Sequence, residues 1–176
     1  TRTSSSAASD VYKRQLVPLQ AIIEARIGEL YREDAATLCD IEALGIRTQG
    51  QIFALASQLL GWDAGAAADN AGAMHMCIGA IRAMAYQATL QTQMELQEES
   101  AALVRDLALL AQKHLKALKS SPIERKALSA FMPIVPLQDY LSHIIGTDFD
   151  VDKMDFDTRS LKRQFNMLMT AISGRL

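Results

Sequence analysis

The feature that most constrains this chain is a helical pattern that continues almost without a break from Leu16 to the end. Good helix formers dominate this stretch, above all alanine, leucine, glutamine, methionine and glutamate. No alternating run of β-branched residues is long enough to predict a strand. Glycine and proline fall at only a few points, where they divide the pattern into segments. The sequence therefore predicts an all-α fold of about six helices.

Local signals set the expected boundaries of these helices. Gly45 and Gly50 should weaken the second helix, Gly61 should end it, and Pro133 and Pro136 should kink or divide the fifth. The first helix is expected to open at Pro18, because proline suits the first helical turn, and to end near residues 32–34. The later helices are expected over about 37–60, 64–90, 93–119, 123–145 and 158–173.

Composition and charge narrow the class of protein. The chain has 176 residues, of which 49% are hydrophobic and 22% charged, as expected for one globular domain. A net charge of −2 gives no general case for nucleic-acid binding. No apolar run reaches the ~18–20 residues of a membrane-spanning helix. Cys39 and Cys77 are isolated, which predicts a reducing compartment rather than a disulfide framework.

The first fifteen residues differ in character from the rest. The string SSAASDVYKRQ, residues 5–15, looks like an in-frame translation of a sequencing adapter, as in a metagenomic fragment, and such scars are set apart from fold reasoning. The alternative is a genuine polar tail. Either way we expect residues 1–15 to be disordered and residues 16–176 to form the domain. The adapter interpretation also implies an N-terminal truncation of that domain.

Two stretches carry a resemblance to a known family. Residues 22–61 contain an IEAR helix, then TQG at 48–50 and LLG at the end. Residues 129–156 contain AFMP, VPLQDYL and DFD. Together they resemble the squalene/phytoene synthase family, in particular the branch related to the mitochondrial complex I assembly factor with a phytoene-synthase-like domain. The resemblance implies the C-terminal part of the isoprenoid synthase helical bundle.

The helix over residues 73–87 departs from that family where the chemistry would lie. The family carries a helical Asp-x-x-x-Asp there, usually after an arginine; this chain has Arg82, but Ala83 and Gln87 stand at the aspartate positions. Carboxylates at i and i+4 share a helix face and can hold Mg²⁺ against a diphosphate. Alanine has no ligand atom and glutamine has no charge. The family's first aspartate motif would lie upstream of Leu16.

This departure predicts a degenerate enzyme with no catalytic residue and no metal or cofactor of its own. The leading expectation is an assembly, scaffold or lipid-binding factor. The resemblance implies a role like that of a complex I assembly factor, with an isoprenoid or lipid ligand or a protein partner from respiratory complex assembly. The alternative is an active Mg²⁺-dependent prenyltransferase that joins prenyl diphosphates in isoprenoid or carotenoid biosynthesis. The expected location is the bacterial cytoplasm, including the inner-membrane periphery, or the mitochondrial matrix in a eukaryote.

Four residues are candidates for a substrate or lipid pocket: Arg26, Gly50, Phe53 and Arg82. The arginines could contact a diphosphate or a lipid headgroup, but an ion pair with a nearby acid such as Glu29 or Glu33 is favoured. The glycines at 45, 50, 72 and 79 either let two helices approach closely or leave room for a long apolar ligand, and the sequence does not choose between them. The spacing of His75, Cys77 and Cys39 does not suit zinc, which favours core packing.

Two further patterns have ordinary explanations. Methionines at 74, 76, 84 and 94 are more often core filler than the lining of an adaptable pocket. Asp148 and Asp152 form a literal Asp-x-x-x-Asp, but they lie in the loop before the last helix. A solvated acidic loop near a helix N-terminus is favoured there over a weak cation site or a partner contact.

Overall fold

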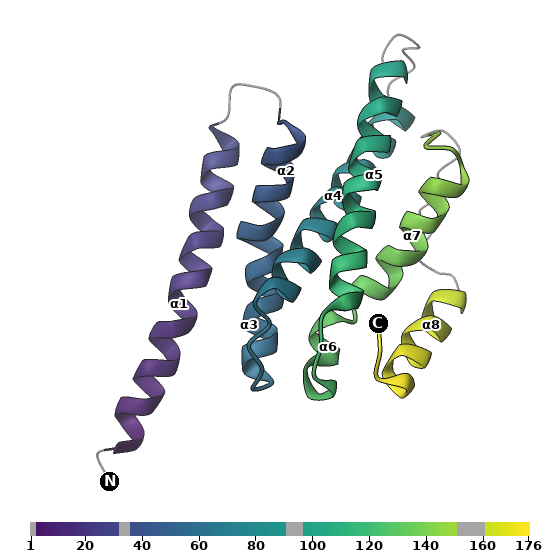
Figure 1. The fold of residues 1–176 in the computed structure, drawn as a ribbon. Coiled ribbons are helices and arrows are strands. Elements are labelled where there is room, and N and C mark those ends of the chain that lie inside the picture. The colour runs from purple at the N-terminus through teal and green to yellow at the C-terminus, as the bar shows by residue number, and fades with distance from the viewer. Residues whose placement is uncertain (1–2, 32–35, 91–96, 151–160) are drawn as a thin grey trace.

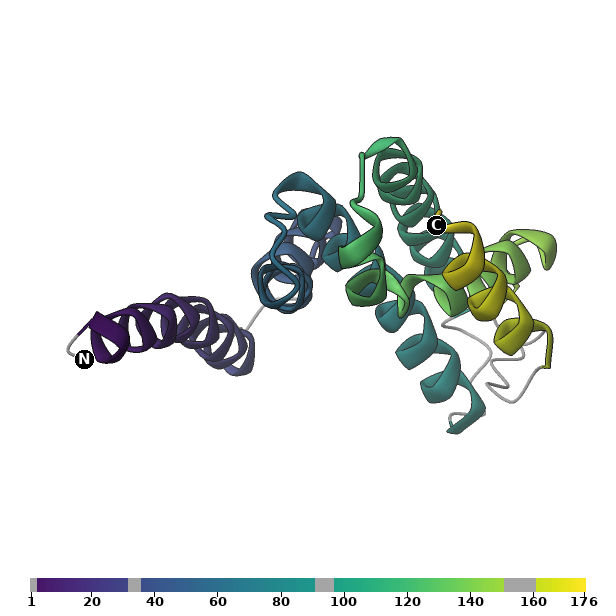
Figure 2. The ribbon, with the colours of Figure 1, turned by 90° about the horizontal axis from the view of Figure 1, so that it is seen from below.

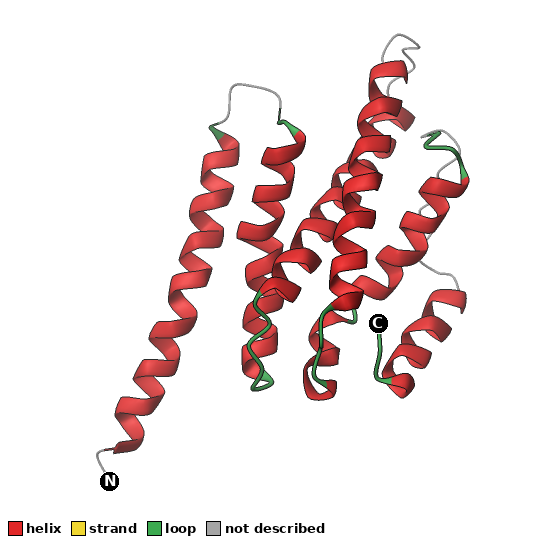
Figure 3. Cartoon of the chain, in the orientation of Figure 1, coloured by secondary structure: helices red, strands yellow, loops and turns green. Residues whose placement is uncertain are grey.

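The computed structural model describes residues 3–31, 36–90, 97–150 and 161–176, and the side chains of 16–31, 36–86, 101–150 and 161–176. All secondary structure in these ranges is helical (Figures 1 and 3), which confirms the all-α prediction. None of the helices described is both long and apolar enough to cross a bilayer.

Helix α1 (Thr3–Leu30) begins well before the expected start. Pro18 lies inside it rather than in its first turn, and residues 3–15, expected to be disordered, are helical. No glycine or proline interrupts residues 3–17, so nothing in their sequence stops the helix. The origin of these residues in an adapter stays a prediction. Helix α1 lies along one edge of the molecule (Figures 1 and 2) and contacts the rest through η1 and α3.

The second expected helix is one continuous rod with a change of pitch. It comprises α2 (Leu38–Gly45), a π-helical turn η1 (Ile46–Gly50) and α3 (Gln51–Leu59). The distortion falls between Gly45 and Gly50, where the sequence predicted weakness. Thr37 caps the N-terminus in a capping box with Asp40. Gly61, with φ of +74°, ends the rod as expected, because glycine takes the left-handed conformation without strain.

Helices α4 (Ala66–Leu90) and α5 (Gln97–Ser120) pair along their length and form the centre of the bundle. Helix α4 also contacts α2, η1, α3 and α7, so most of the molecule is arranged around it. Its buried positions are rich in alanine, which lets neighbouring helices approach closely. The largest fully buried apolar side chains of the core are Phe131, Met74, Ile78, Ile81, Leu107, Leu118, Ile134 and Ile144.

The expected fifth helix is divided, as its prolines predicted. A 3₁₀ turn η3 (Arg125–Ala127) leads into α6 (Leu128–Phe131), and α7 (Ile134–Gly146) follows after Pro133. Pro136 lies in the first turn of α7, where a missing N–H costs no helical hydrogen bond. The last helix, α8 (Leu161–Ser173), packs on α7 at the edge of the molecule opposite α1 (Figure 1).

Candidate functional site

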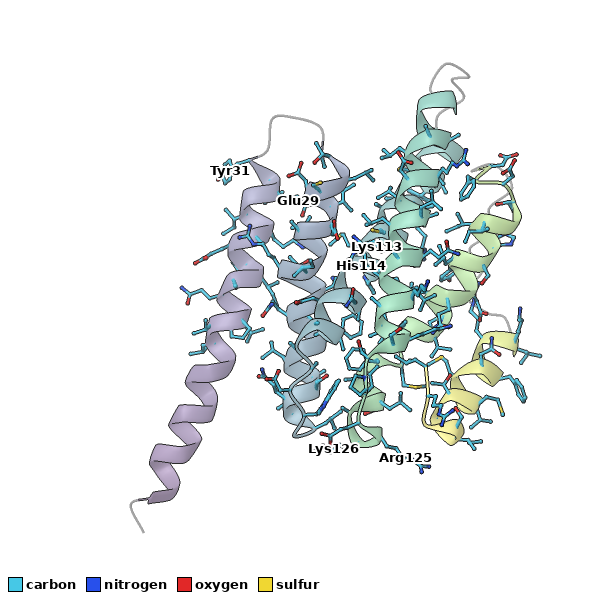
Figure 4. All side chains as sticks on the ribbon, viewed as in Figure 1. Glu29, Tyr31, Lys113, His114, Arg125 and Lys126 are labelled. Carbon is cyan, nitrogen blue, oxygen red and sulfur yellow. The ribbon has the colours of Figure 1, made fainter. Side chains whose placement is uncertain are left out.

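A group of polar side chains lies between α2, α4 and α5, and we call it the Glu42–His114 cluster. His114 on α5 is buried, and its Nε2 lies 2.9 Å from Oε1 of Glu42 on α2. Its Nδ1 lies 2.8 Å from Oδ1 of Asn70 on α4. Lys113, which is exposed, lies 3.8 Å from the same Glu42 oxygen. Figure 4 shows Lys113 and His114 together on the middle of α5.

Hydrogen bonding fixes the orientation of this cluster. Asn70 donates from Nδ2 to the Ala66 carbonyl at 2.7 Å, so its Oδ1 faces the histidine. Each ring nitrogen of His114 therefore faces an oxygen acceptor. Both contacts are hydrogen bonds only when each nitrogen carries a proton, that is, when the ring is a cation beside the Glu42 carboxylate.

The geometry of the cluster suits structure better than catalysis. A general base needs one nitrogen directed at the proton that it removes, and both nitrogens of His114 are occupied by protein atoms. Burial, with a smaller contribution from the negative charge of Glu42, raises the pKa of the Cys77 thiol to about 12. A thiol with that pKa is not an activated nucleophile. The cluster thus connects three helices through polar contacts.

Sequence reasoning missed this cluster, although one signal for it existed. Leu107, Ala111 and Leu118 form the buried stripe of α5, and His114 lies in the same stripe at helical spacing. A histidine inside an apolar stripe needs buried hydrogen-bond partners. Its partners, however, are 44 and 72 residues away along the chain, and only the packing of α2 and α4 identifies them.

The four candidate pocket residues lie in four different environments. Arg26 is exposed on α1 and pairs with Glu29 at 2.7 Å, which confirms the ion-pair interpretation. Gly50 is buried against α4, and Phe53 is a core residue stacked on Phe131 with ring centroids 5.6 Å apart. Arg82 lies over the Tyr140 ring of α7, with its Cζ 5.2 Å from the centroid.

The glycines that the sequence left ambiguous separate clearly. A Cβ on Gly72 would lie 2.2 Å from the Gly50 nitrogen and 2.6 Å from the Gly45 oxygen. Gly45 and Gly50 meet backbone atoms of α4 in the same crossing. Gly79, in contrast, is exposed and has open space around it. At Gly45, Gly50 and Gly72, the absence of a side chain lets two helix backbones approach closely. Backbone atoms occupy the space there that a ligand would need.

Of the two positions where the resemblance would place aspartates, the structure describes the side chain of one. Ala83 is exposed on α4, and the side chain of Gln87 lies outside the described residues, as does Asp152. Among the side chains described, no three from histidine, cysteine, aspartate or glutamate come together as a metal site would require.

An open cleft of about 310 Å³ lies between α7 and α8, where it is lined by Gln138, Asp139, Asn166 and Thr170 among others.

Burial also affects two other titratable groups on α4. Burial raises the pKa of the Asp69 carboxyl. Burial also lowers the pKa of His75, and the positive charge of Arg82 lowers it further. His75 meets the edge of Phe53, with ring centroids 6.4 Å apart. Met74 and Cys77 are fully buried, as the core interpretation expected, whereas Cys39 is exposed.

The two cysteines should differ sharply in reactivity. We expect Ellman's reagent to label Cys39 at once in the native protein and to label Cys77 at least about a thousandfold more slowly, because Cys77 must await unfolding. The Cys39→Ser variant should then show no rapid reaction until denaturant is added. Rapid labelling of native Cys39→Ser would contradict the burial of Cys77.

Comparison with known proteins found no match to this chain among family models, curated proteins or solved structures.

Proposed function

We propose that this chain is a catalytically degenerate protein of the squalene/phytoene synthase type that acts as an assembly or scaffold factor. The observation that carries the proposal is the surface of α4 at Arg82 and Ala83. Ala83 is exposed and offers no ligand atom, and Arg82 lies against Tyr140. A prenyl transfer enzyme would need acidic side chains here, because ionisation of an allylic diphosphate leaves charge that metal ions stabilise.

The glycine crossing supports the same conclusion. A long prenyl chain would need space beside Gly50 and Phe53, the candidate pocket positions. The backbone of α4 fills the space at Gly50, and Phe131 covers Phe53. Close packing at this point favours a rigid framework over a deep binding cavity.

The exposed apolar side chains of α1 support a partner-binding role. They are Leu16, Val17, Leu19, Ile23, Ile27 and Leu30, and Tyr31 directly follows the helix; Val17, Ile23, Leu30 and Tyr31 are more than half exposed. Exposed apolar side chains that gather on one helix commonly mark a protein interaction site. An assembly factor of the type that serves respiratory complex I would use such a surface to hold a partner while the complex is built.

A diphosphate-release assay tests the proposal. We expect the protein with Mg²⁺ and farnesyl or geranylgeranyl diphosphate to release no diphosphate above the protein-free rate. Each 1.36 kcal/mol of lost transition-state stabilisation slows the reaction tenfold, and a missing metal cluster removes several such increments. A known squalene synthase in the same buffer is the positive control.

Two outcomes of this assay are informative beyond the expected one. Mg²⁺-dependent release would overturn the proposal in favour of an active prenyltransferase. Binding of geranylgeranyl diphosphate in calorimetry, without turnover, would retain the degenerate enzyme but replace the scaffold role with lipid binding.

A further inference from the structure

Helix α8 presents its apolar side chains away from the protein. Leu161, Phe165, Leu168 and Ile172 are between 56% and 80% exposed, and no residue of the helix is fully buried. Their spacing of three or four residues places all four on one face of the helix. Met169, which is 45% exposed, lies at the margin of this face and lines the cleft against α7. Figures 1 and 2 place α8 at the periphery, beside α7. An amphipathic helix in a bundle normally turns such a face inward.

Polar side chains on the opposite face of α8 hold it to α7. Asn166 donates from Nδ2 to both carboxylate oxygens of Asp139, at 3.0 and 3.1 Å. The Arg163 guanidinium lies over the Tyr140 ring, with its Cζ 4.2 Å from the centroid. These contacts give α8 a defined rotation about its own axis, and that rotation directs the apolar face outward.

The charges on this helix indicate what would cover the face. Helix α8 contains the basic residues Lys162 and Arg163 and no aspartate or glutamate, and Arg175 follows its C-terminal end. Lys162 and Arg175 are exposed, whereas the chain as a whole has a net charge of −2. Large apolar side chains combined with basic residues characterise helices that lie in the interface of an anionic bilayer.

We infer that α8 is an interfacial helix that binds the protein to anionic lipid surfaces. Phe165, Leu168 and Ile172 enter the boundary between headgroups and acyl chains, and Lys162 extends its ammonium group to the phosphates. This inference concerns a different surface from α1, and it holds whether or not the scaffold role is correct.

Vesicle co-sedimentation tests the inference. The full chain should sediment with vesicles of equal parts phosphatidylglycerol and phosphatidylcholine, and only weakly with phosphatidylcholine alone. The Phe165→Glu/Leu168→Glu variant should bind at least about tenfold more weakly, because each substitution removes a large apolar contact. Lys162→Gln should weaken binding about fivefold, since one basic residue near the surface contributes about that factor.

A matched control separates this helix from general surface effects. Leu109 on α5 is 48% exposed, so Leu109→Glu makes the same kind of change elsewhere. It should leave vesicle binding unchanged, and circular dichroism should show native helicity for every variant.

Two results would overturn the inference. One is absence of sedimentation with anionic vesicles. The other is a concentration-dependent dimer that the Phe165→Glu/Leu168→Glu variant abolishes, with no difference between the two vesicle types; the face would then be an interface between two copies of the chain. The diphosphate-release assay does not affect either result. The proposed scaffold role and the proposed membrane binding of α8 can therefore fail independently.

Discussion

Replacing Gly72 with alanine should strongly destabilise the protein, whereas the same change at Gly79 on the same helix should stabilise it. Alanine gains about 1 kcal/mol over glycine in a helix interior, and this gain applies at both positions. At Gly79 nothing lies within 4 Å of the added Cβ, so the gain is realised. At Gly72 the three nearest atoms lie at 2.2, 2.5 and 2.6 Å and all belong to backbone.

Backbone cannot rotate away as a side chain can, so the crossing of α2, η1 and α4 must widen to admit the methyl group. Overpacking costs about 1–3 kcal/mol, occasionally more, and this site belongs at the upper end of that range. We expect Gly72→Ala to lower the midpoint of thermal unfolding by about 5 °C or more and Gly79→Ala to raise it by about 2–4 °C. Circular dichroism melts of the two variants measure both. Equal midpoints would show that the helices do not cross at Gly72.

The same glycines show what the sequence could and could not predict. The weakness of the helix at Gly45 and Gly50, where the π-helical turn occurs, could be predicted because it depends only on local helix propensity. Whether the missing side chains made room for backbone or for a ligand depends on which helix lies opposite. Gly72 and Gly79 look alike in the sequence, yet one lies in a backbone crossing and the other faces solvent.

Long-range partners limited the prediction of the site in the same way. The Arg26–Glu29 pair could be anticipated, because residues three apart on a helix are neighbours. Glu42 and Asn70 could not be assigned to His114, since they come from separate helices. The start of α1 was missed for a different reason. The adapter interpretation predicts disorder for residues 3–15, whereas no glycine or proline in these residues interrupts a helix.

The Glu42–His114 contact should contribute measurably to stability. Removing Glu42 by alanine leaves a ring nitrogen of His114 without its carboxylate, and the His114 side chain is only 8% exposed. A lost hydrogen bond to a charged group costs about 1.5–3 kcal/mol. The Glu42 side chain is 28% exposed, so water compensates in part and the lower end of that range is expected.

A double-mutant cycle isolates this contact from the other effects of the substitutions. Glu42→Ala, His114→Ala and the double variant should give a coupling energy of about 1–2 kcal/mol in urea unfolding. Lys113→Ala is the matched control, because that lysine is 70% exposed and lies 3.8 Å from the same oxygen. It should change the free energy of unfolding by less than about 0.5 kcal/mol.

The cycle also distinguishes hydrogen bonding from charge. Glu42→Gln keeps an oxygen acceptor for Nε2 but removes the carboxylate, so a small loss would show that the acceptor is sufficient. A loss close to that of Glu42→Ala would show that the ring is a cation that requires its counter-charge. A coupling energy below about 0.5 kcal/mol would mean that α2 and α5 are held together by apolar packing alone. The polar cluster would then be a consequence of the fold and not one of its causes.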